Sequence, residues 1–354
     1  MEFEVAREAF SDLSTVPACT KNPNHEKFIK FDEFKVEDLP EDMRREEIYQ
    51  YIKNIGLRVV RLTVKKDDES TVWGTGVVYK AGIYYGILTN DHVVASQTDV
   101  ENCTIDFFYH TEGQPLIQSK GQALQIGSAI QDKSIFTFSP IPESLERMKL
   151  KDNSDSLAQV TLIFDDGSKS TVVGCIAREM SKWFVLVPRD NQEQIVAVEV
   201  VFFEAKTGRS YLYEAGSELI DVSDPKAVQI EVPDDNVPQF VKDFTFDKFK
   251  APWPKGNGNF TPLVIAHPHG GPKTITMGKL LDFEDRGRIA LIHHTAETCP
   301  GSSGGLLITL GGDTSSYCEF CNTVGVHCEG QKVEEYKGMK LDNGNLNVSL
   351  FNNS

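Results

Sequence analysis

The sequence has no apolar run near the ~20 residues that a membrane-spanning helix requires. Residues 1–8 are acidic, whereas a secretory signal is basic and then apolar. Basic residues are also few: 36 Lys and Arg stand against 52 Asp and Glu, for a formal net charge of −16. This charge argues against non-specific binding to nucleic acid or to an anionic membrane. We therefore expect an intracellular protein with neither kind of partner.

Cysteine is scarce, and its count is odd. The seven cysteines are at positions 19, 103, 175, 299, 318, 321 and 328. An odd number favours a reducing compartment over a framework of disulfides. Cys318 and Cys321 form one CxxC pair, but the second pair of a typical zinc knuckle is missing. We therefore expect buried free thiols, no metal site and no cofactor.

The 354 residues suffice for one large or two medium domains. A short helix is predicted over residues 41–52, where charges begin the segment and apolar residues recur at helical spacing. Strands dominate after it, because apolar and polar residues alternate between polar turns. The first six predicted strands are 57–64, 74–79, 83–88, 104–109, 123–126 and 135–138.

A Gly-Ser-Ser-Gly-Gly motif occupies residues 301–305. Glycines on both sides of Ser303 permit a tight turn that presents its hydroxyl as a nucleophile. The N–H groups of Gly301 and Ser303 would then point into one space, as an oxyanion hole requires. Leu306-Leu307-Ile308 predicts a buried strand directly after the turn.

A general base for such a serine stands far upstream. Residues 86–94 read Gly-Ile-Leu-Thr-Asn-Asp-His-Val-Val, in which an apolar strand delivers His92 at its end. Histidine is the side chain best suited to exchange protons near neutral pH.

Together with residues 73–79 (Trp-Gly-Thr-Gly-Val-Val-Tyr) and 263–278, these motifs resemble the trypsin-like (chymotrypsin-fold) serine proteases. The likeness is to the high-temperature-requirement and glutamyl-endopeptidase branches, and it covers residues 56–142 and 260–331. It implies an all-β fold of two six-stranded antiparallel β-barrels, with an N-terminal helical extension and a β-rich insertion. The expected division is 1–55 extension, 56–142 first barrel, 143–258 insertion and connector, 259–335 second barrel and 336–354 C-terminal tail.

The resemblance implies an acid that orients His92. Asp132 stands between the fifth and sixth predicted strands, where the family carries this residue. Asp224 also precedes an alternating strand and stands closer to Ser303 in the chain, so it is the alternative. An acid at either position would hold the productive tautomer of His92.

The implied activity is cleavage of polypeptides by Ser303, His92 and an aspartate. In the glutamyl endopeptidases a histidine at the position of His327, and a threonine before the nucleophile, here Thr298, help to receive an acidic side chain. A preference for an acidic residue before the cleaved bond is therefore a hypothesis. The alternative function is a protease-like scaffold that binds peptide without cleaving it. His267 and His269 lack a third convergent donor and are expected to serve a loop, not a metal.

Overall fold

The computed structural model describes residues 19, 21–22, 25–81, 84–114, 116–128, 132–147, 157–179, 182–188, 194–204, 209–222, 227–239, 242, 260–285, 289–310, 325–332, 335–341 and 345–352. Strands make up most of its regular structure, and the helices are short. The all-β class expected from the sequence is confirmed.

Six antiparallel strands close into a barrel, in the order β2-β3-β4-β7-β6-β5. They are β2 (Val59–Lys65), β3 (Thr71–Ala81), β4 (Tyr84–Thr89), β5 (Cys103–Phe107), β6 (Ile117–Ser128) and β7 (Lys133–Ser139). In β2 the side chains of Val60, Leu62 and Val64 are fully buried, while the residues between them reach the surface in part. This period of two places one face of the strand in the barrel core, as alternation in the sequence predicts.

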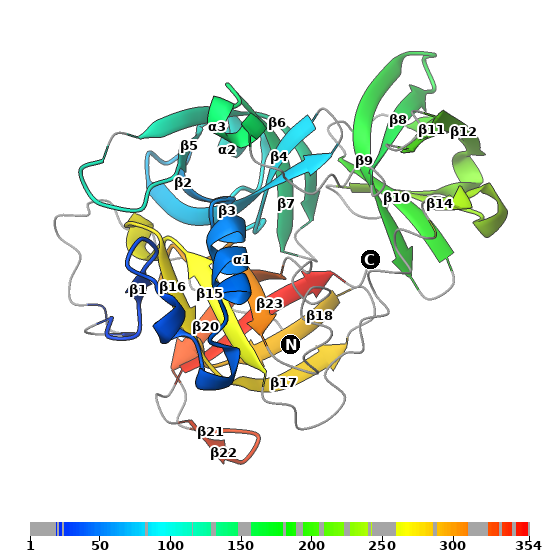
Figure 1. The fold of residues 1–354 in the computed structure, drawn as a ribbon. Coiled ribbons are helices and arrows are strands. Elements are labelled where there is room, and N and C mark those ends of the chain that lie inside the picture. Colours follow the sequence, from blue (N-terminus) through cyan, green and yellow to red (C-terminus); the bar gives the residue numbers. More distant parts are fainter. Residues whose placement is uncertain are drawn as a thin grey trace.

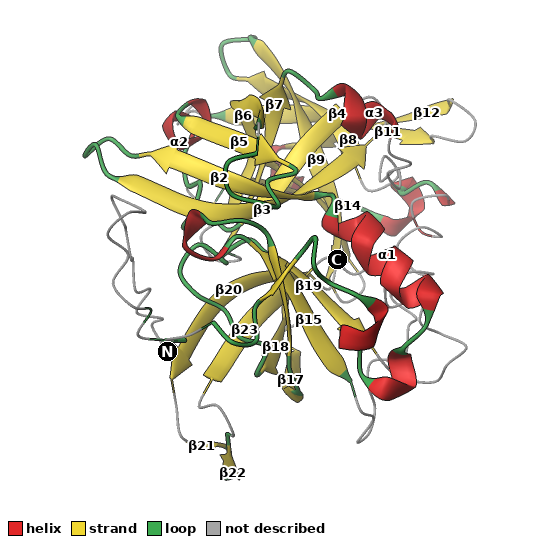
Figure 2. Cartoon of the chain, turned by 60° about the vertical axis from the view of Figure 1, so that its left-hand side comes forward, coloured by secondary structure: helices red, strands yellow, loops and turns green. Residues whose placement is uncertain are grey.

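The second unit is an eight-stranded sheet, in the order β1-β16-β15-β19-β20-β23-β18-β17, which lies below the barrel in Figures 1 and 2. Its strands are β1 (Ile29–Lys30), β15 (Thr261–Ala266), β16 (Thr274–Met277), β17 (Leu280–Asp285), β18 (Ile289–His294), β19 (Leu306–Leu310), β20 (Gly325–Lys332) and β23 (Asn345–Asn352).

Two of these eight strands lie outside the expected second barrel. β1 comes from the N-terminal extension and pairs with β16. β23 comes from residues 336–354, which were expected to be a tail, and it pairs with both β18 and β20. Polar and apolar residues alternate in β23, and Leu346, Asn347 and Ser349 are all buried, so both faces of the strand are covered and it fits an interior position of the sheet. The expected tail is therefore corrected to a strand of the second unit.

The middle of the chain forms a third, seven-stranded sheet beside the barrel (Figure 1), in the order β12-β11-β8-β9-β10-β14-β13. Its strands are β8 (Leu157–Phe164), β9 (Lys169–Glu179), β10 (Lys182–Pro188), β11 (Ile195–Glu204), β12 (Arg209–Gly216), β13 (Ile220–Asp221) and β14 (Ala227–Val232). The sheet has its own apolar core, in which Trp183 and Phe202 are almost fully buried. Its β9, β10 and β14 contact β6 of the barrel.

Helix α1 (Glu46–Gly56) joins the barrel to the second sheet (Figure 2). It buries Ile52 and Ile55 in a core shared with Val77 of the barrel and Leu263 of the second sheet. The remaining helices are a single turn or little more: α2 (Gln97–Glu101), α3 (Glu143–Arg147), and the 3₁₀ helices η2 (Val36–Asp38), η3 (Glu41–Met43), η5 (Ser217–Leu219), η6 (Asp234–Asn236) and η7 (Pro268–Gly270). A two-stranded sheet of β21 (Glu335–Tyr336) and β22 (Met339–Lys340) completes the fold.

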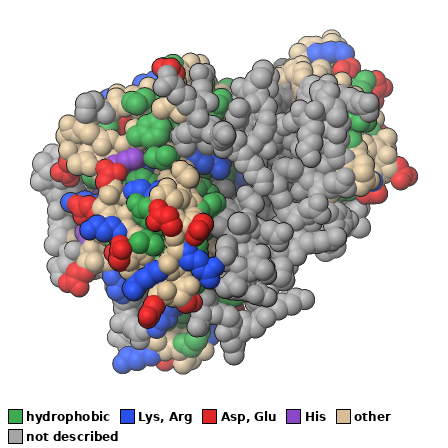
Figure 3. Space-filling view, viewed as in Figure 1, with side chains coloured by type: hydrophobic (Ala, Val, Ile, Leu, Met, Phe, Trp, Pro, Cys, Tyr) green, Lys and Arg blue, Asp and Glu red, His purple; other side chains and the backbone are tan. Residues whose placement is uncertain are grey.

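Acidic and basic side chains are interspersed on the described part of the face in Figure 3. The excess of acidic residues therefore does not gather into one patch there. Within the described ranges, no helix has the length and apolar character needed to cross a membrane.

Candidate active site

His92 and Asp132 lie side by side at one end of the barrel. Strands β4 and β7 are paired with Thr89 opposite Ser134, so the residues just beyond that end meet. The His92 Nδ1 lies 2.9 Å from each carboxylate oxygen of Asp132. The backbone N–H of His92 also donates to Asp132 Oδ1, at 3.1 Å. The carboxylate therefore contacts both the ring and the backbone N–H of His92. The ring nitrogen Nε2 is directed away from Asp132.

The loop that carries Asp132 is itself held in place. Asp132 has a φ of +42°, in the left-handed region that aspartate tolerates better than most residues. The side-chain amide of Asn90 donates to the carbonyl oxygen of Asp132, at 2.9 Å. Two residues of the Leu-Thr-Asn-Asp-His motif, Asn90 and His92, thus contact the same aspartate.

Thr75 of β3 connects the barrel to the serine loop of the second sheet. Its N–H donates to the carbonyl oxygen of Ser303 at 2.8 Å, and its hydroxyl donates to the carbonyl oxygen of Gly301 at 2.8 Å. Its own carbonyl oxygen accepts the hydroxyl of Thr89, at 2.7 Å. Because Thr89 ends β4, only three positions before His92, these bonds dock the serine loop next to the histidine turn.

Two glycines of the serine loop occupy space in which a side chain does not fit. Gly304 has a φ of +83°, and a Cβ there would lie 1.9 Å from the carbonyl oxygen of Thr75. Gly301 has a φ of +87°, and a Cβ there would lie 2.8 Å from the carbonyl oxygen of His267. Glycine at position 304 is thus a geometric requirement of the contact between the two units, and glycine at position 301 is a requirement of packing within the second unit.

The two residues assigned to specificity lie in the second sheet and its serine loop. Thr298 is almost fully buried, and its hydroxyl donates to Asn347 Oδ1 of β23 at 2.6 Å. His327 is buried in β20; its N–H donates to the carbonyl oxygen of Gly305 at 3.0 Å, and its carbonyl oxygen accepts the N–H of Gly304 at 2.9 Å. Two backbone hydrogen bonds therefore join strand β20 to the serine loop.

A cation that the sequence did not suggest lies beside Thr298 and Asn347. The Lys21 ammonium donates to Thr298 Oγ1 at 3.1 Å and to Asn347 Oδ1 at 2.9 Å. Burial lowers the pKa of His327 well below its usual value, and the Lys21 charge lowers it further. Burial likewise lowers the pKa of the neighbouring His294 to about 3, again assisted by Lys21. The imidazoles are therefore neutral, and the positive charge here is that of Lys21.

His267 contacts the backbone of its own loop. It is fully buried, its Nδ1 lies 2.9 Å from the carbonyl oxygen of Gly271, and its ring stacks on Tyr109. Burial lowers the pKa of His267 well below its usual value. His269, two residues on, contacts His25 instead, with 3.2 Å between the two Nε2 atoms.

Several predicted residues lie outside the described part of the chain. They are Asp224, the alternative acid, and the CxxC pair of Cys318 and Cys321. Conversely, Lys21, Asn347 and Thr75 were not anticipated. Lys21 lies in an irregular segment and Asn347 in the presumed tail, so no local pattern connected either one to Thr298. Thr75 belongs to the recognised Trp-Gly-Thr-Gly block, but its contact with Ser303 spans 228 positions of the chain and has no local signature.

A closed six-stranded antiparallel barrel packs against a second antiparallel sheet, with a histidine turn from one docked beside a serine loop from the other. This is the arrangement of the trypsin-like serine protease fold. No protein-family model matches the sequence, and no curated protein matches it.

Solved structures similar to this chain are proteases of the HtrA and Deg type. They include the HtrA-type protease AlgW with a tripeptide (TM-score 0.39, 12% identity, covering 86% of this chain and 59% of that one). The Rv3671c protease of M. tuberculosis in its active form has a TM-score of 0.38 and 14% identity, over 85% of this chain and 78% of that one. Deg5 has a TM-score of 0.38 and 13% identity, over 82% and 88%. These values are too low to transfer an activity to this chain.

Proposed function

We propose that this protein is a serine endopeptidase in which Ser303 is the nucleophile, His92 the general base and Asp132 the orienting acid. The observation that carries the proposal is the bond between Thr75 N–H and Ser303 O, 2.8 Å long. It joins the serine loop to β3, whose partner β4 leads into the His92–Asp132 pair. We infer from this bond that a serine, a histidine and an aspartate from distant parts of the chain act together at this junction.

In the proposed reaction Ser303 Oγ attacks the carbonyl carbon of the scissile bond, and His92 Nε2 takes its proton. His92 then gives that proton to the leaving amine, and a water molecule hydrolyses the acyl-enzyme by the same route in reverse. Asp132 remains ionised, keeps Nδ1–H directed at its carboxylate and stabilises the imidazolium. The N–H groups of Gly301 and Ser303 bind the oxyanion.

We further propose that the substrate carries an acidic residue before the cleaved bond. The support comes from three neighbouring groups: the Lys21 ammonium, the Thr298 hydroxyl and the neutral imidazole of His327. A carboxylate approaching Thr298 would accept a hydrogen bond from the Lys21 ammonium, and charge-assisted bonds of this kind are the strong ones. The substrate class is therefore a polypeptide with glutamate or aspartate at that position.

Fluorophosphonate labelling of purified protein tests the assignment of the nucleophile. The wild type is expected to be labelled, whereas Ser303→Ala and His92→Ala are not. Ser168→Ala, in an exposed turn between β8 and β9, is the matched control and is expected to be labelled like the wild type. Equal labelling of wild type and Ser303→Ala would refute Ser303 as the nucleophile. No labelling of any of these proteins would favour the peptide-binding scaffold.

A further inference from the structure

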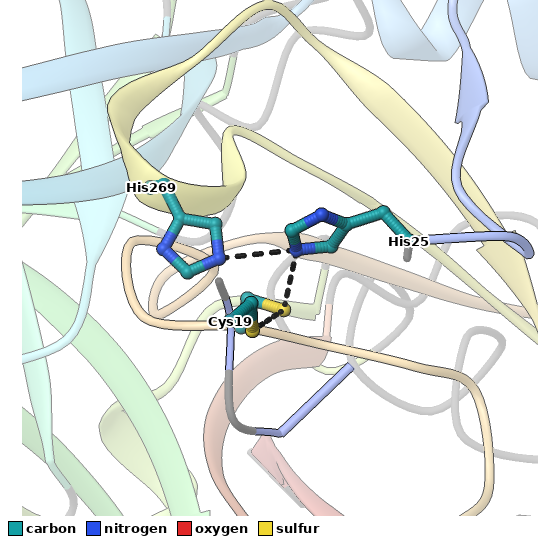
Figure 4. A group of neighbouring side chains, drawn as sticks. Cys19, His25 and His269 are labelled. Atoms are coloured by element: carbon teal, nitrogen blue, oxygen red, sulfur yellow. Dashed lines mark hydrogen bonds between the residues drawn. The ribbon is translucent and has the colours of Figure 1, made fainter. Parts of the chain in front are cut away.

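Four side chains outside the proposed triad converge on one point: Cys19, His25, His269 and Cys299. Their ligand atoms, two sulfurs and two imidazole nitrogens, all lie within 4.8 Å of one another. Cys19 and His25 belong to the N-terminal segment, His269 to the η7 turn between β15 and β16, and Cys299 to the loop before Ser303. Figure 4 shows Cys19, His25 and His269 directed toward one another from separate parts of the ribbon.

Three separations within this cluster are close to those of a tetrahedral ligand shell. The Sγ atoms of Cys19 and Cys299 are 3.4 Å apart, the Nε2 atoms of His25 and His269 are 3.2 Å apart, and Cys299 Sγ is 3.4 Å from His25 Nε2. Zinc bonds of about 2.3 Å to sulfur and about 2.0 Å to nitrogen give tetrahedral ligand-to-ligand distances of roughly 3.3–3.8 Å. We propose that these four side chains bind a structural zinc ion.

The surroundings of the two sulfurs suit thiolates bound to a metal. Cys19 and Cys299 are 8% and 4% exposed. Asn22 donates to both: its backbone N–H to Cys19 Sγ at 3.3 Å, and its side-chain amide to Cys299 Sγ at 3.3 Å. Hydrogen bonds to the ligand atoms orient them and disperse their charge, as the outer shell of a zinc site does. Asn22 also donates to the carbonyl oxygen of Thr298 at 2.9 Å, which fixes the amide in this position.

The types of ligand in this cluster indicate which metal binds, and their number indicates the role of the metal. Two thiolates and two imidazoles favour zinc over magnesium or calcium, which take oxygen ligands. Four protein ligands close a tetrahedral shell, so the ion has a structural role and no open position for a reacting water. A disulfide requires sulfurs about 2.05 Å apart, well below the Sγ separation of 3.4 Å found here.

A zinc ion at this point would tie three segments of the chain together. Cys299 is four positions before Ser303, and the N–H of His269 donates to the carbonyl oxygen of Pro300, at 2.5 Å. Cys19 and His25 flank Lys21, so the ion would also fix the segment that directs this lysine to Thr298. This consequence for the serine loop and for specificity rests on the proposed protease function, whereas the metal site itself does not.

Metal analysis of the full chain, purified without chelators and then incubated with ZnCl₂ and desalted, tests the site. Wild type is expected to retain about one zinc ion per chain, and Cys19→Ser and His269→Ala to retain little. Cys103→Ser is the matched control, because Cys103 is a buried free thiol in β5 of the barrel, and it is expected to retain the wild-type content. Chelation of the wild type is expected to lower Tm by several degrees, since the metal binds only the folded chain.

Cobalt substitution gives a readout on the wild type itself, which does not require any variant to fold. Wild type loaded with CoCl₂ is expected to show thiolate-to-cobalt charge transfer and the intense visible bands of a tetrahedral site. His25→Gln, which leaves the other three ligands in place, is expected to shift these bands. No zinc and no cobalt spectrum in the wild type would overturn the proposal, as would a mass spectrum showing Cys19 and Cys299 joined by a disulfide.

The two proposals fail separately. Zinc bound at these four residues in a chain that fluorophosphonate does not label would refute the protease and leave the metal site standing. A labelled, metal-free chain would refute the metal site alone.

Discussion

The backbone N–H of Thr75 donates to the carbonyl oxygen of Ser303, at 2.8 Å, across the boundary between the barrel and the second sheet. Neither residue needs its side chain for this bond, so the position of the serine loop depends on backbone geometry. The hydroxyl of Thr75 adds a bond to Gly301 O at 2.8 Å and accepts the N–H of His267 at 3.0 Å. One strand residue thus holds both the serine loop and the turn that begins at His267.

Replacing Gly304 should disrupt this contact. A Cβ at Gly304 would lie 1.9 Å from Thr75 O, so Gly304→Ala is expected to cost more than about 3 kcal/mol in the free energy of unfolding and to abolish fluorophosphonate labelling. Gly167→Ala is the control: it has a similar φ of +81° but nothing within 4 Å, and should cost only about 1 kcal/mol. Urea unfolding measures the free energy of unfolding of both variants. Equal losses in the two would show that the close approach to Thr75 does not destabilise Gly304→Ala.

Asp132→Asn tests the orienting role. The amide keeps the shape of the side chain but cannot hold the same tautomer of His92, so kcat is expected to fall about 10⁴-fold. Asp166→Asn, in an exposed turn of the third sheet, is the control and should leave kcat unchanged. A fall of less than about tenfold for Asp132→Asn would reassign the acid, with Asp224 as the next candidate.

Lys21→Gln tests the preference for acidic substrates. Loss of the cation that donates to Thr298 at 3.1 Å is expected to reduce kcat/KM for a peptide with glutamate before the cleaved bond about 10- to 100-fold. The same peptide with glutamine should be affected much less. Lys30→Gln removes an exposed lysine that pairs with Glu33 and should change neither value. An unchanged ratio between the two peptides would exclude Lys21 from substrate selection.

The stability of the fold should depend on pH through Lys273. Burial lowers the pKa of Lys273 to about 7 from 10.5, and its ammonium donates to Gly56 O at the end of α1, at 2.7 Å. Between these two pH values the unfolded chain binds a proton that the folded chain does not, so the free energy of unfolding rises with pH. Below about pH 7 both states bind this proton, and the increase in the free energy of unfolding is lost.

Lys273→Met should remove that slope. Relative to wild type, the variant is expected to be more stable at pH 6 by an amount on the order of a few kcal/mol, and to lose this advantage toward pH 10. Lys340→Met, at an exposed position of β22, should follow the wild type throughout. Urea unfolding at several pH values gives the comparison, and parallel curves for wild type and Lys273→Met would contradict the assignment.

Much of the fold follows from local patterns. Five of the six strands of the barrel lie within three residues of their expected ranges, because alternation of apolar and polar residues places one face of each strand in the core. The sixth, β6, begins at Ile117, six residues before its expected start. The β-rich middle segment is a sheet for the same reason. β23 was missed because its polar Asn345 and Asn347 resemble a tail until the neighbouring strands β18 and β20 are known.

The candidate site likewise has a part that local sequence predicts and a part that depends on the tertiary structure. By itself the sequence determined which residues could act as nucleophile and base, because Gly-Ser-Ser-Gly-Gly and the strand that ends in His92 have local geometries that suit those roles. Only the tertiary structure decided what surrounds them. His269 was judged unfit for a metal for want of further donors, and those donors proved to be Cys19, His25 and Cys299, which lie 250, 244 and 30 positions away along the chain. Contacts over such distances are set by sheet pairing and core packing, which no short stretch of sequence encodes.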